Sequence, residues 1–374
     1  MSQLPTTMTA VTLNGHGGPE MLELRTDLPL PKFGPEDVLV QVLAAGVNNT
    51  DINTRKAWYS KQESDAEDAS WAGQPLHFPR IQGADVCGRV IAVGENVTQD
   101  LIGQRVLLEP CLQYAHGTKL EAPWYLGSEC DGGFAEYVSV DHHHVYPIQS
   151  ALSDQELASF PCSYSTAENM LTRANVQSGE QLLITGASGG VGSAAVQLAK
   201  ARGANVVAVS SASKAPLLLE LGADRVLDRK DDLTDSLGTN SIDVVIDLVA
   251  GEQWPSFMEV LKPKGRYTVA GAIGGPLVEL DVRTLYLNDL SFFGCTMLER
   301  KCSAISSAMS KRAASNHWSH KPSPSLKSKR HRRCLSKRSI LGRSCCRSLA
   351  KPQKRAKQKL PQRTERDQQH SIDF

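Results

Sequence analysis

The stretch QLLITGASGGVGSAAVQLAKARGANVVAVSSASK, residues 181–214, decides the fold. It begins with the apolar run Leu182–Ile184, which predicts a short buried strand, and it ends in the β-branched run Val206–Val209 of a second strand. Between the two runs, a glycine-rich turn leads into small and apolar residues that recur at helical spacing. The order of strand, turn, helix and strand predicts a βαβ unit of an α/β fold with a doubly wound parallel sheet.

The turn has the composition of an anion-binding site. Glycines at 189 and 192 allow the backbone to approach a pyrophosphate closely, and the N-terminus of the following helix offers N–H groups and a positive dipole end. An ordinary tight turn between a strand and a helix is the alternative. We predict that the turn binds a dinucleotide through Ala187, Ser188, Gly189, Gly190, Val191 and Gly192.

The end of the second strand predicts which dinucleotide is bound. An acidic residue there would bind the ribose 2′-hydroxyl, but the chain has Ser210, Ser211 and Lys214, which suit a 2′-phosphate. Arg229, just past the expected strand at 225–228, is placed to close over the same phosphate. Solvated surface charge is the alternative for both cations. The sequence therefore predicts NADPH as the cofactor.

Length and composition predict two folded domains. The 374 residues exceed what one hydrophobic core usually organises, and 41% of them are hydrophobic. Short strands separated by Gly and Pro predict a small β-barrel-type domain over residues 1–150, and alternating helices and strands predict the parallel-sheet domain over 151–299. The sequence has no apolar run of about 18 residues and no signal-like N-terminus, so we expect a cytoplasmic protein without membrane contact.

Individual elements can be placed by their patterns. We expect strands at 10–13, 38–44, 88–93, 105–108 and 135–140 in the first domain. In the second domain we expect one helix over 153–171, begun by a capping box of Ser153 and Glu156, then a helix ending before 221–224, strands at 242–249, 265–270 and 290–296, and a helix at 254–261.

The C-terminal part differs in composition from the rest. Residues 300–374 carry 21 Lys and Arg against 3 Asp and Glu, net +18, which leaves −17 for the first 299 residues. Periodicity is lost, and Ser, Lys and Arg dominate. We therefore expect a disordered basic C-terminal tail. The charge would allow nucleic-acid binding, but Trp318 and Phe374 are its only aromatic residues, so a nucleic-acid partner is not expected.

Several segments of residues 1–299 resemble the medium-chain dehydrogenase/reductase superfamily, and most closely its zinc-independent quinone oxidoreductase branch. The segments are AAGVNNTDINTR (44–55), IQGADVCGRVIAVGENV (81–97), GGFAEYV (132–138), YSTAENML (164–171), GASGGVGSAAVQLAK (186–200), LGADRVLD (221–228) and LKPKGRYTVAG (261–271). The resemblance implies a GroES-like catalytic domain docked on a Rossmann domain, with the active site between them, and a homodimer if the C-terminus is intact. It also assigns Thr166 and Ala270 to the cofactor site.

The resemblance also allows a check for a catalytic metal. In the zinc-dependent branch, a Cys, a His and another Cys hold the ion. The corresponding residues here are Asn48, Ala84 and Cys162, and neither an amide nor a methyl group can replace a thiolate and an imidazole. The consecutive histidines 142–144 are a second candidate, but neighbouring strand residues point to alternate faces, so we expect surface or rim positions. The sequence predicts no metal ligands.

Without a metal, the reaction requires an acceptor that takes hydride readily, such as a quinone or an α,β-unsaturated carbonyl. Donors in the cleft must stabilise the negative oxygen that develops. By resemblance these are Asn48, Asp51 and Tyr59, although Tyr59 could equally be packing. The polar loop 56–75, which contains Trp58 and Trp71, is expected to line the substrate entrance.

The family pattern stops inside LER, residues 298–300, before the superfamily's last helices and strands. A neighbouring reading frame of the tail permits a long stretch that resembles this missing C-terminus. We hypothesise that residues 300–374 are an out-of-frame translation. Two alternatives to an active NADPH-dependent reductase therefore stay open: a zinc-type alcohol dehydrogenase-like enzyme, and a catalytically dead truncated remnant that at most binds NADPH.

Overall fold

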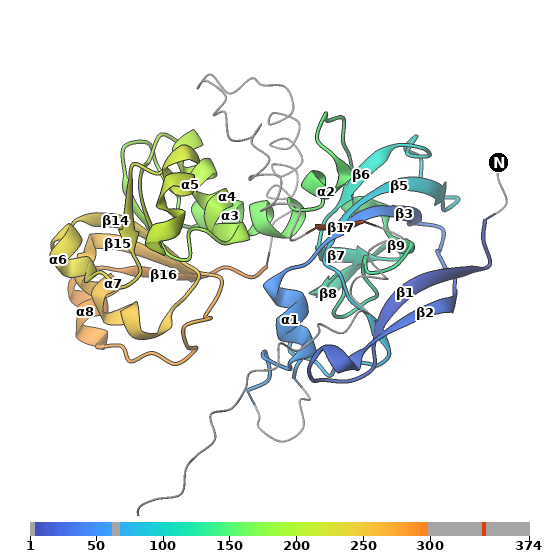
Figure 1. Ribbon diagram of the computed structural model, residues 1–374, viewed down its shortest axis with the longest axis horizontal. Helices are drawn as coiled ribbons and strands as arrows, with labels where there is room; N and C mark the ends of the chain where they lie inside the picture. The colour runs from blue at the N-terminus through green and yellow to red at the C-terminus, as the bar shows by residue number, and fades with distance from the viewer. Residues whose placement is uncertain (1–3, 62–67, 298–338, 342–374) are drawn as a thin grey trace, which may run out of the picture.

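The computed structural model of the chain describes residues 4–61 and 68–297, together with the backbone of residues 339–341. These residues form two lobes, one built mainly from antiparallel strands and one built around a parallel sheet (Figure 1). This arrangement confirms the predicted α/β class with a GroES-like part and a Rossmann part. No helix within the described residues is long and apolar enough to span a bilayer.

The N-terminal lobe consists of curled antiparallel sheets. Its strands are β1 (Thr7–Leu13), β2 (Leu22–Pro29), β3 (Asp37–Gly46), β4 (Arg80–Ile81), β5 (Asp85–Val93), β6 (Arg105–Leu108), β7 (Cys111–Ala115), β8 (Thr118–Tyr125), β9 (Tyr137–Asp141) and β10 (Val145–Pro147). Three short helices belong to it: η1 (Pro19–Met21), α1 (Asn49–Arg55) and η2 (His142–His144). The main sheet has the order β10-β6-β5-β3, with β9 on the free side of β3. All five strands predicted for this region exist, with ends that differ by at most a few residues.

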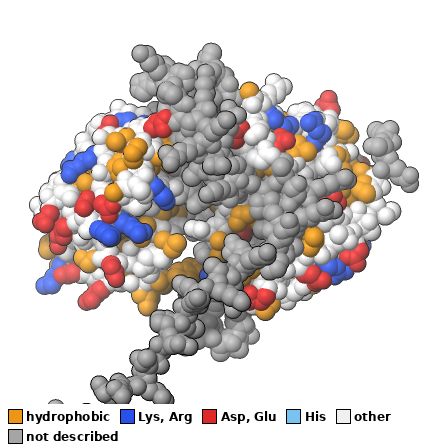
Figure 2. All heavy atoms as spheres, viewed as in Figure 1, with side chains coloured by type: hydrophobic (Ala, Val, Ile, Leu, Met, Phe, Trp, Pro, Cys, Tyr) orange, Lys and Arg blue, Asp and Glu red, His pale blue; other side chains and the backbone are white. Residues whose placement is uncertain are grey.

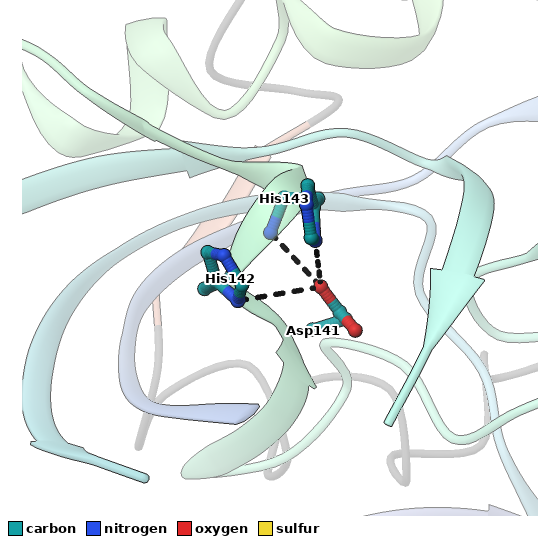
Figure 3. A group of neighbouring side chains, drawn as sticks. All are labelled: Asp141, His142 and His143. Carbon is teal, nitrogen blue, oxygen red and sulfur yellow. Dashed lines mark hydrogen bonds and ion pairs between the residues drawn. The ribbon is translucent and has the colours of Figure 1, made fainter. Parts of the chain in front are cut away.

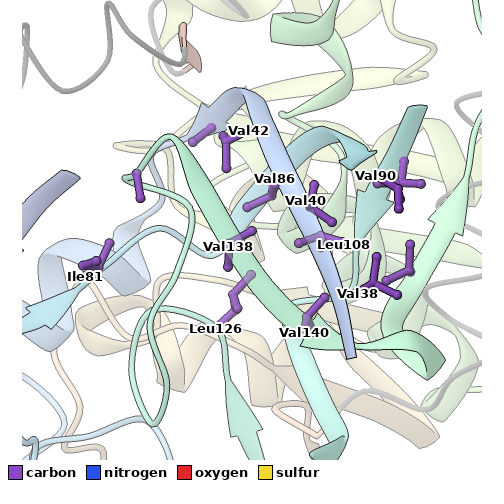
Figure 4. Packing of buried hydrophobic residues seen from close by; sticks show 14 of the residues in the cluster. Val38, Val40, Val42, Ile81, Val86, Val90, Leu108, Leu126, Val138 and Val140 are labelled. Carbon is purple, nitrogen blue, oxygen red and sulfur yellow. The ribbon is translucent and has the colours of Figure 1, made fainter. Parts of the chain in front are cut away.

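The core of this lobe follows from the two-residue period of its strands. Val38, Val40 and Val42 of β3 point to one face, where they pack against apolar side chains of β5, β6 and β9 (Figure 4). Asp37 and Asp141, which are paired across β3 and β9, belong to the opposite face. The strand pattern therefore separates an apolar core from polar groups on the other side of the same sheet.

The predicted helix over 153–171 is two helices. The structure has α2 (Asp154–Leu157) and α3 (Pro161–Arg173), and the capping box of Ser153 and Glu156 is present at the start of α2. The break falls at Pro161, which has no N–H to continue the first helix and is favourable at the start of the second. Leu157 packs against the sheet of the first lobe, whereas Met170 of α3 packs in the second lobe.

The second lobe is a six-stranded, fully parallel sheet in the order β13-β12-β11-β14-β15-β16. Its strands are β11 (Gln181–Ile184), β12 (Asn205–Ser210), β13 (Arg225–Asp228), β14 (Ile242–Asp247), β15 (Leu261–Val269) and β16 (Ser291–Gly294). The helices are α4 (Gly190–Ala201), η3 (Ala212–Lys214), α5 (Ala215–Glu220), α6 (Leu233–Leu237), η4 (Gly251–Gln253), α7 (Trp254–Val260) and α8 (Val282–Leu287). On the face drawn in Figure 2, Lys and Arg side chains of this lobe are interspersed with Asp and Glu.

One described element lies in the tail that was predicted to be disordered. The backbone of Ser339–Leu341 forms β17, which pairs antiparallel with Ala44–Gly46 of β3. Strand β9 pairs only with the first half of β3, at Asp37–Gln41, so the main chain of the second half is open to another strand on that side. The prediction of disorder is therefore wrong for these three residues. The rest of residues 300–374, with the reading-frame hypothesis attached to it, lies outside the described residues.

Candidate active site

The glycine-rich turn lies at the point where the strand order of the parallel sheet reverses. From β11 the chain proceeds to β12 and β13 on one side, and it returns to β14 on the other side. Ligands of such sheets bind outside the carboxyl ends of the strands at this reversal. The backbone N–H of Ala187 donates to the Val209 carbonyl at 3.1 Å, which fixes the turn against the end of β12.

The turn is tightly packed, and its glycines at 189 and 192 make this packing possible. A Cβ on Gly192 would lie 2.6 Å from the Cα of Ala187, and one on Gly189 would lie 3.2 Å from the Gly186 oxygen. Helix α4 begins after Gly189, and no side chain caps that end. The first N–H groups of α4 therefore have no partner within the helix and fit the pyrophosphate of a dinucleotide.

The structure brings Lys214 to the turn. Its Nζ donates to the Oγ of Ser188 at 3.1 Å, although 26 positions separate the two residues. Ser210 is buried at the end of β12, and its carbonyl accepts from the backbone N–H of Arg229 at 2.9 Å. Ser210 and Arg229, which were predicted from the ends of two strands, are thus adjacent because β12 pairs with β13.

Sequence reasoning missed an acid beside these residues. Asp228, the last residue of β13, accepts a hydrogen bond from the backbone N–H of Ala212 at 2.7 Å. The hydrogen bonds from the backbone of Ala212 and Lys230 lower the pKa of Asp228, so its carboxylate is charged. The sequence did offer a sign of this acid. Asp228 ends a predicted strand that neighbours the strand with the serines.

A buried network lies behind the turn. Asp247, the last residue of β14, is fully buried and accepts hydrogen bonds from the hydroxyls of Thr185 and Tyr267. Its main-chain carbonyl accepts from the N–H of Ala270 at 3.2 Å. Ala270 therefore lies beside the carboxyl end of β14, on the side of the sheet where the cofactor is expected. The network was not predicted, because its members are far apart in the sequence.

In the first lobe, helix α1 positions Asn48 and Asp51. The Asp51 carboxylate accepts the backbone N–H of Asn48 at 2.7 Å and that of Ala84 at 3.3 Å. Burial raises the pKa of Asp51 to about 6, against the lowering effect of these hydrogen bonds. The Nδ2 of Asn48 is buried and makes no hydrogen bond of regular geometry with a described residue, but it lies beside the Asp85 carboxyl group, whose pKa its contact lowers. Because an amide nitrogen carries two N–H groups, one of them can still donate to an acceptor.

A second buried acid lies next to this pair. Asp85 of β5 is 2% exposed, and it accepts the backbone N–H of Cys162 at 2.7 Å. Burial raises the pKa of Asp85 to about 7, and the charge of nearby Asp51 acts in the same direction. Two buried carboxyl groups thus share one region of low dielectric. Asp85 was not predicted as a site residue.

Aromatic side chains complete the first lobe's part of the site. The Tyr125 hydroxyl donates to the Sγ of Cys162 at 3.2 Å, and Trp71 stacks on the Tyr125 ring with 4.8 Å between centroids. The Tyr59 hydroxyl donates to Oγ1 of Thr50 at 3.1 Å, and burial raises the pKa of Tyr59. Tyr59 therefore packs on the helix that carries Asp51. Of the predicted entrance loop, Trp58 is 45% exposed.

Thr166 joins the two lobes. It lies inside α3. Its hydroxyl hydrogen-bonds the Cys162 thiol, and Cys162 in turn is held by Asp85 of the first lobe. Asp85 and Cys162 of the substrate side are thereby connected to α3, the helix that packs in the second lobe.

The residues that stand where the zinc-dependent branch has its metal ligands do not fit a zinc ion. Ala84 and Cys162 pack together with Cys111 and Tyr125 in one small buried cluster. Burial raises the pKa of the Cys162 thiol, which disfavours the thiolate that a metal needs. With one protonated thiol, a methyl group and an amide, this donor set does not fit a catalytic zinc ion.

Comparison with known proteins places the chain in a family. Residues 34–150 match the profile of the alcohol dehydrogenase GroES-like domain, and residues 190–312 match that of the zinc-binding dehydrogenase. The chain belongs to the medium-chain dehydrogenase/reductase superfamily, and it is an oxidoreductase of the class that uses nicotinamide cofactors and small-molecule substrates.

Individual relatives come from two branches. Human quinone oxidoreductase is 30% identical over 297 residues, which cover 78% of this chain and 80% of the relative. The NAD-dependent alcohol dehydrogenase of Sulfolobus acidocaldarius is 32% identical over 287 residues, covering 72% and 79%. The crystal structure of a candidate alcohol dehydrogenase from Sinorhizobium meliloti 1021 superposes with a TM-score of 0.76 at 40% identity, covering 84% of this chain and 89% of the other.

Proposed function

We propose that this chain is an NADPH-dependent reductase that transfers hydride to a quinone or an α,β-unsaturated carbonyl without a catalytic metal. The observation that carries the proposal is the donor set at the substrate side. It offers the buried Nδ2 of Asn48, which lies beside Asp85, together with the methyl group of Ala84 and the protonated thiol of Cys162. Such a set can hydrogen-bond a developing oxyanion but cannot ligate a metal.

The bound nicotinamide supplies the hydride. The chain's own residues bind the cofactor, orient the acceptor and stabilise the negative oxygen that develops on it. The turn at 187–192 binds the pyrophosphate, and Asn48 donates to the acceptor oxygen. Asp85, whose pKa lies near 7, holds its proton on about half of the chains at neutral pH and so limits the negative charge beside that oxygen, whereas Asp51, with a pKa near 6, is mostly ionised there. Tyr59, kept protonated by a raised pKa, is a second candidate donor.

Preference for the phosphorylated cofactor rests on Lys214. Its ammonium group lies at the turn, beside Ser188, where charge-assisted hydrogen bonds to a 2′-phosphate are within reach. Ser210, Ser211 and Arg229 surround the same place. The carboxylate of Asp228 opposes them, because it adds negative charge there. We propose that the cations prevail and that NADPH binds more tightly than NADH.

The test is cofactor consumption by the purified chain with a panel of quinones, enones, aldehydes and alcohols. We expect NADPH oxidation with quinones or enones, a slower reaction with NADH, and no loss of rate after incubation with a strong chelator. Turnover that stops on chelation and returns with Zn²⁺ would instead favour the zinc-type alcohol dehydrogenase function. The same panel applied to a chain with a repaired reading frame shows whether residues 300–374 limit activity.

A second candidate is a chain that binds NADPH without turnover. The observation that favours it is exposed apolar surface on the second lobe, where Leu277, Tyr286 and Leu287 are 91%, 61% and 71% exposed. The same surface, beside the edge strand β16, would also serve a homodimer, which we propose for the active form. Sedimentation velocity shows whether this surface is exposed in a monomer or buried in a homodimer. A melting curve with NADPH shows whether the site binds the cofactor at all.

A further inference from the structure

A group of acids and histidines gathers at the end of the first lobe where β3 begins. We call it the rim cluster; its members are Glu36, Asp37, His116, Asp141, His142 and His143. They come from the start of β3, the tip of the β7–β8 hairpin, the end of β9 and helix η2. Asn48 follows the other end of β3, about 30 Å away at about 3.4 Å per strand residue. The rim cluster is therefore separate from the candidate active site.

Two buried carboxyl groups face each other in the rim cluster. Asp37 and Asp141 are directly paired across β3 and β9, and their side chains are 1% and 0% exposed. Paired residues have Cβ atoms about 4.5–5.5 Å apart, so like charges here repel unless a cation lies near. The Asp141 carboxyl group accepts the backbone N–H of Gly117 at 2.6 Å and that of His143 at 3.0 Å.

Two imidazole rings turn toward that carboxylate (Figure 3). The Oδ1 of Asp141 lies 3.6 Å from Nδ1 of His142 and 2.7 Å from Nδ1 of His143. The expectation that neighbouring histidines point to alternate faces is wrong for this pair, because both belong to a 3-10 turn and not to a strand. His144 differs, since its ring is fully buried and contacts Glu109.

The spacing of these atoms suits a metal ion. Metal–ligand bonds of about 2.0–2.2 Å in a tetrahedral site place neighbouring ligand atoms about 3.4 Å apart. One atom from each of Asp141, His142 and His143 lies within 4.8 Å of the others. The Oε2 of Glu36 is 3.6 Å from Nδ1 of His142 and offers a fourth ligand. An ion here would replace two hydrogen bonds, that of Nδ1 of His142 to the Glu36 carbonyl at 3.0 Å and that of Nδ1 of His143 to Asp141 at 2.7 Å.

A further buried oxygen points to a missing partner. The Oδ1 of Asp37 is buried and has no hydrogen-bond partner among the described residues, whereas its other oxygen accepts from His116 and Gly34. Buried polar atoms are nearly always paired, so this oxygen on the strand partner of Asp141 indicates that a proton, a water molecule or an ion is bound in this region. Mixed imidazole and carboxylate donors select Zn²⁺ and similar transition metals over Ca²⁺ or Mg²⁺.

We propose that Asp141, His142 and His143, with Glu36 as the fourth ligand, bind one divalent transition-metal ion such as Zn²⁺. The ion links β3 through Glu36 with β9 and η2, and it neutralises the paired carboxylates. It takes no part in hydride transfer. Its effect is on the stability of the first lobe, because a ligand that binds only the folded chain stabilises it by mass action.

The test is titration of the full, untagged chain with Zn²⁺ in competition with a chromophoric chelator. We expect one tight site per chain, and affinity at least about tenfold lower in His142→Ala and in His143→Ala. The exposed His77 provides the matched control, and His77→Ala should bind like the unchanged chain. Equal affinity in all four proteins, or no stoichiometric binding by the unchanged chain, would overturn the proposal.

A second measurement needs no substitution, in case a variant fails to fold. Co²⁺ added to the unchanged chain should give weak visible bands of nitrogen and oxygen ligation, and one equivalent of Zn²⁺ should remove them. An intense near-ultraviolet band from sulfur ligation would place the ion at a cysteine such as Cys162 and contradict the proposed site. Circular dichroism of each variant in chelator confirms that the proteins being compared are folded.

Discussion

The two halves of the candidate active site are built in opposite ways. The cofactor half uses mainly backbone: a turn of six consecutive residues, 187–192, whose N–H groups begin α4. The substrate half uses side chains from separate elements, namely Asp51 on α1, Asp85 on β5, Tyr125 on β8 and Cys162 on α3. The turn has no charged side chain of its own, whereas the substrate half holds two buried carboxyl groups.

This difference separates binding from chemistry. Backbone N–H groups recognise a phosphate in any enzyme of this class, so the turn reports the cofactor type and little about the reaction. The buried acids, the Asn48 amide and the thiol decide what happens to the acceptor. The predictions below test each half in turn.

The largest effect is expected for the pH dependence of stability. Burial raises the pKa of Asp85 from an ordinary value near 4 to about 7, so the folded chain holds this proton between pH 4 and 7 while the unfolded chain loses it. The stabilisation is complete below pH 4 and is lost as the pH rises to 7, by about 4 kcal/mol at about 1.4 kcal/mol per pH unit. Denaturant unfolding of Asp85→Asn should lose the part of this slope that Asp85 contributes and keep the smaller part from Asp51, whose pKa is raised to about 6.

The exposed Asp100 gives the control for that experiment. Asp100→Asn should follow the unchanged chain at every pH. If Asp85→Asn also runs parallel to the unchanged chain from pH 4 to 7, Asp85 ionises normally, and the substrate half does not contain the acid that we describe.

The next largest effect is expected for the proposed oxyanion donor. Asn48→Ala removes the buried Nδ2, and loss of one oxyanion donor lowers kcat by about 10²–10³-fold. The KM for NADPH should not change, because the turn is untouched. Asn48 also precedes α1, so Tm must be compared; Asn14→Ala, an exposed amide, is the control. Equal losses in kcat and in cofactor affinity would mean that the two halves are not separable.

The cofactor half should respond to a single methyl group. In Gly192→Ala the new Cβ meets backbone atoms of Gly186 and Ala187, which cannot move without displacing the turn. Overpacking of this kind costs about 1–3 kcal/mol, which predicts about 10- to 100-fold weaker NADPH binding by fluorescence titration. Gly294→Ala, where the added Cβ meets no atom within 4 Å, should bind normally. Unchanged binding by Gly192→Ala would show that the close approach is not required.

The same contrast explains what the sequence could predict. Contiguous patterns such as 181–214 contain a strand, a turn and a helix in order, so the parallel sheet and the turn were predicted. The strand β13 was predicted to the residue. Asp85, Tyr125 and Asp247 were missed, because each acts through partners at least 20 positions away. No local pattern distinguishes such a residue from an ordinary core or surface position.

The break at Pro161 and the turn at His142–His144 were missed for a different reason. The apolar residues on both sides of Pro161 follow one helical period, which predicted a single helix. Proline starts a helix more readily than it continues one, so a second helix begins there. The histidines continue directly from β9, and a strand and a 3-10 turn differ there only in backbone angles. Orientation of both imidazoles toward Asp141 follows from the turn, which the sequence pattern does not specify.

The smallest effect is expected for cofactor choice, where the positive charge of Lys214 and the negative charge of Asp228 act in opposite directions. Lys214→Ala should weaken NADPH binding about tenfold and leave NADH binding unchanged, because the ammonium group beside Ser188 is proposed to bind the 2′-phosphate, which NADH lacks. Asp228→Asn should act in the opposite direction and tighten NADPH binding, since the charged carboxylate beside Ala212 repels the phosphate. Lys32→Ala, an exposed cation of the other lobe, controls for net charge. Should Lys214→Ala weaken both cofactors equally, Lys214 acts on the turn through Ser188 and not on the phosphate, and the preference for NADPH must come from another residue.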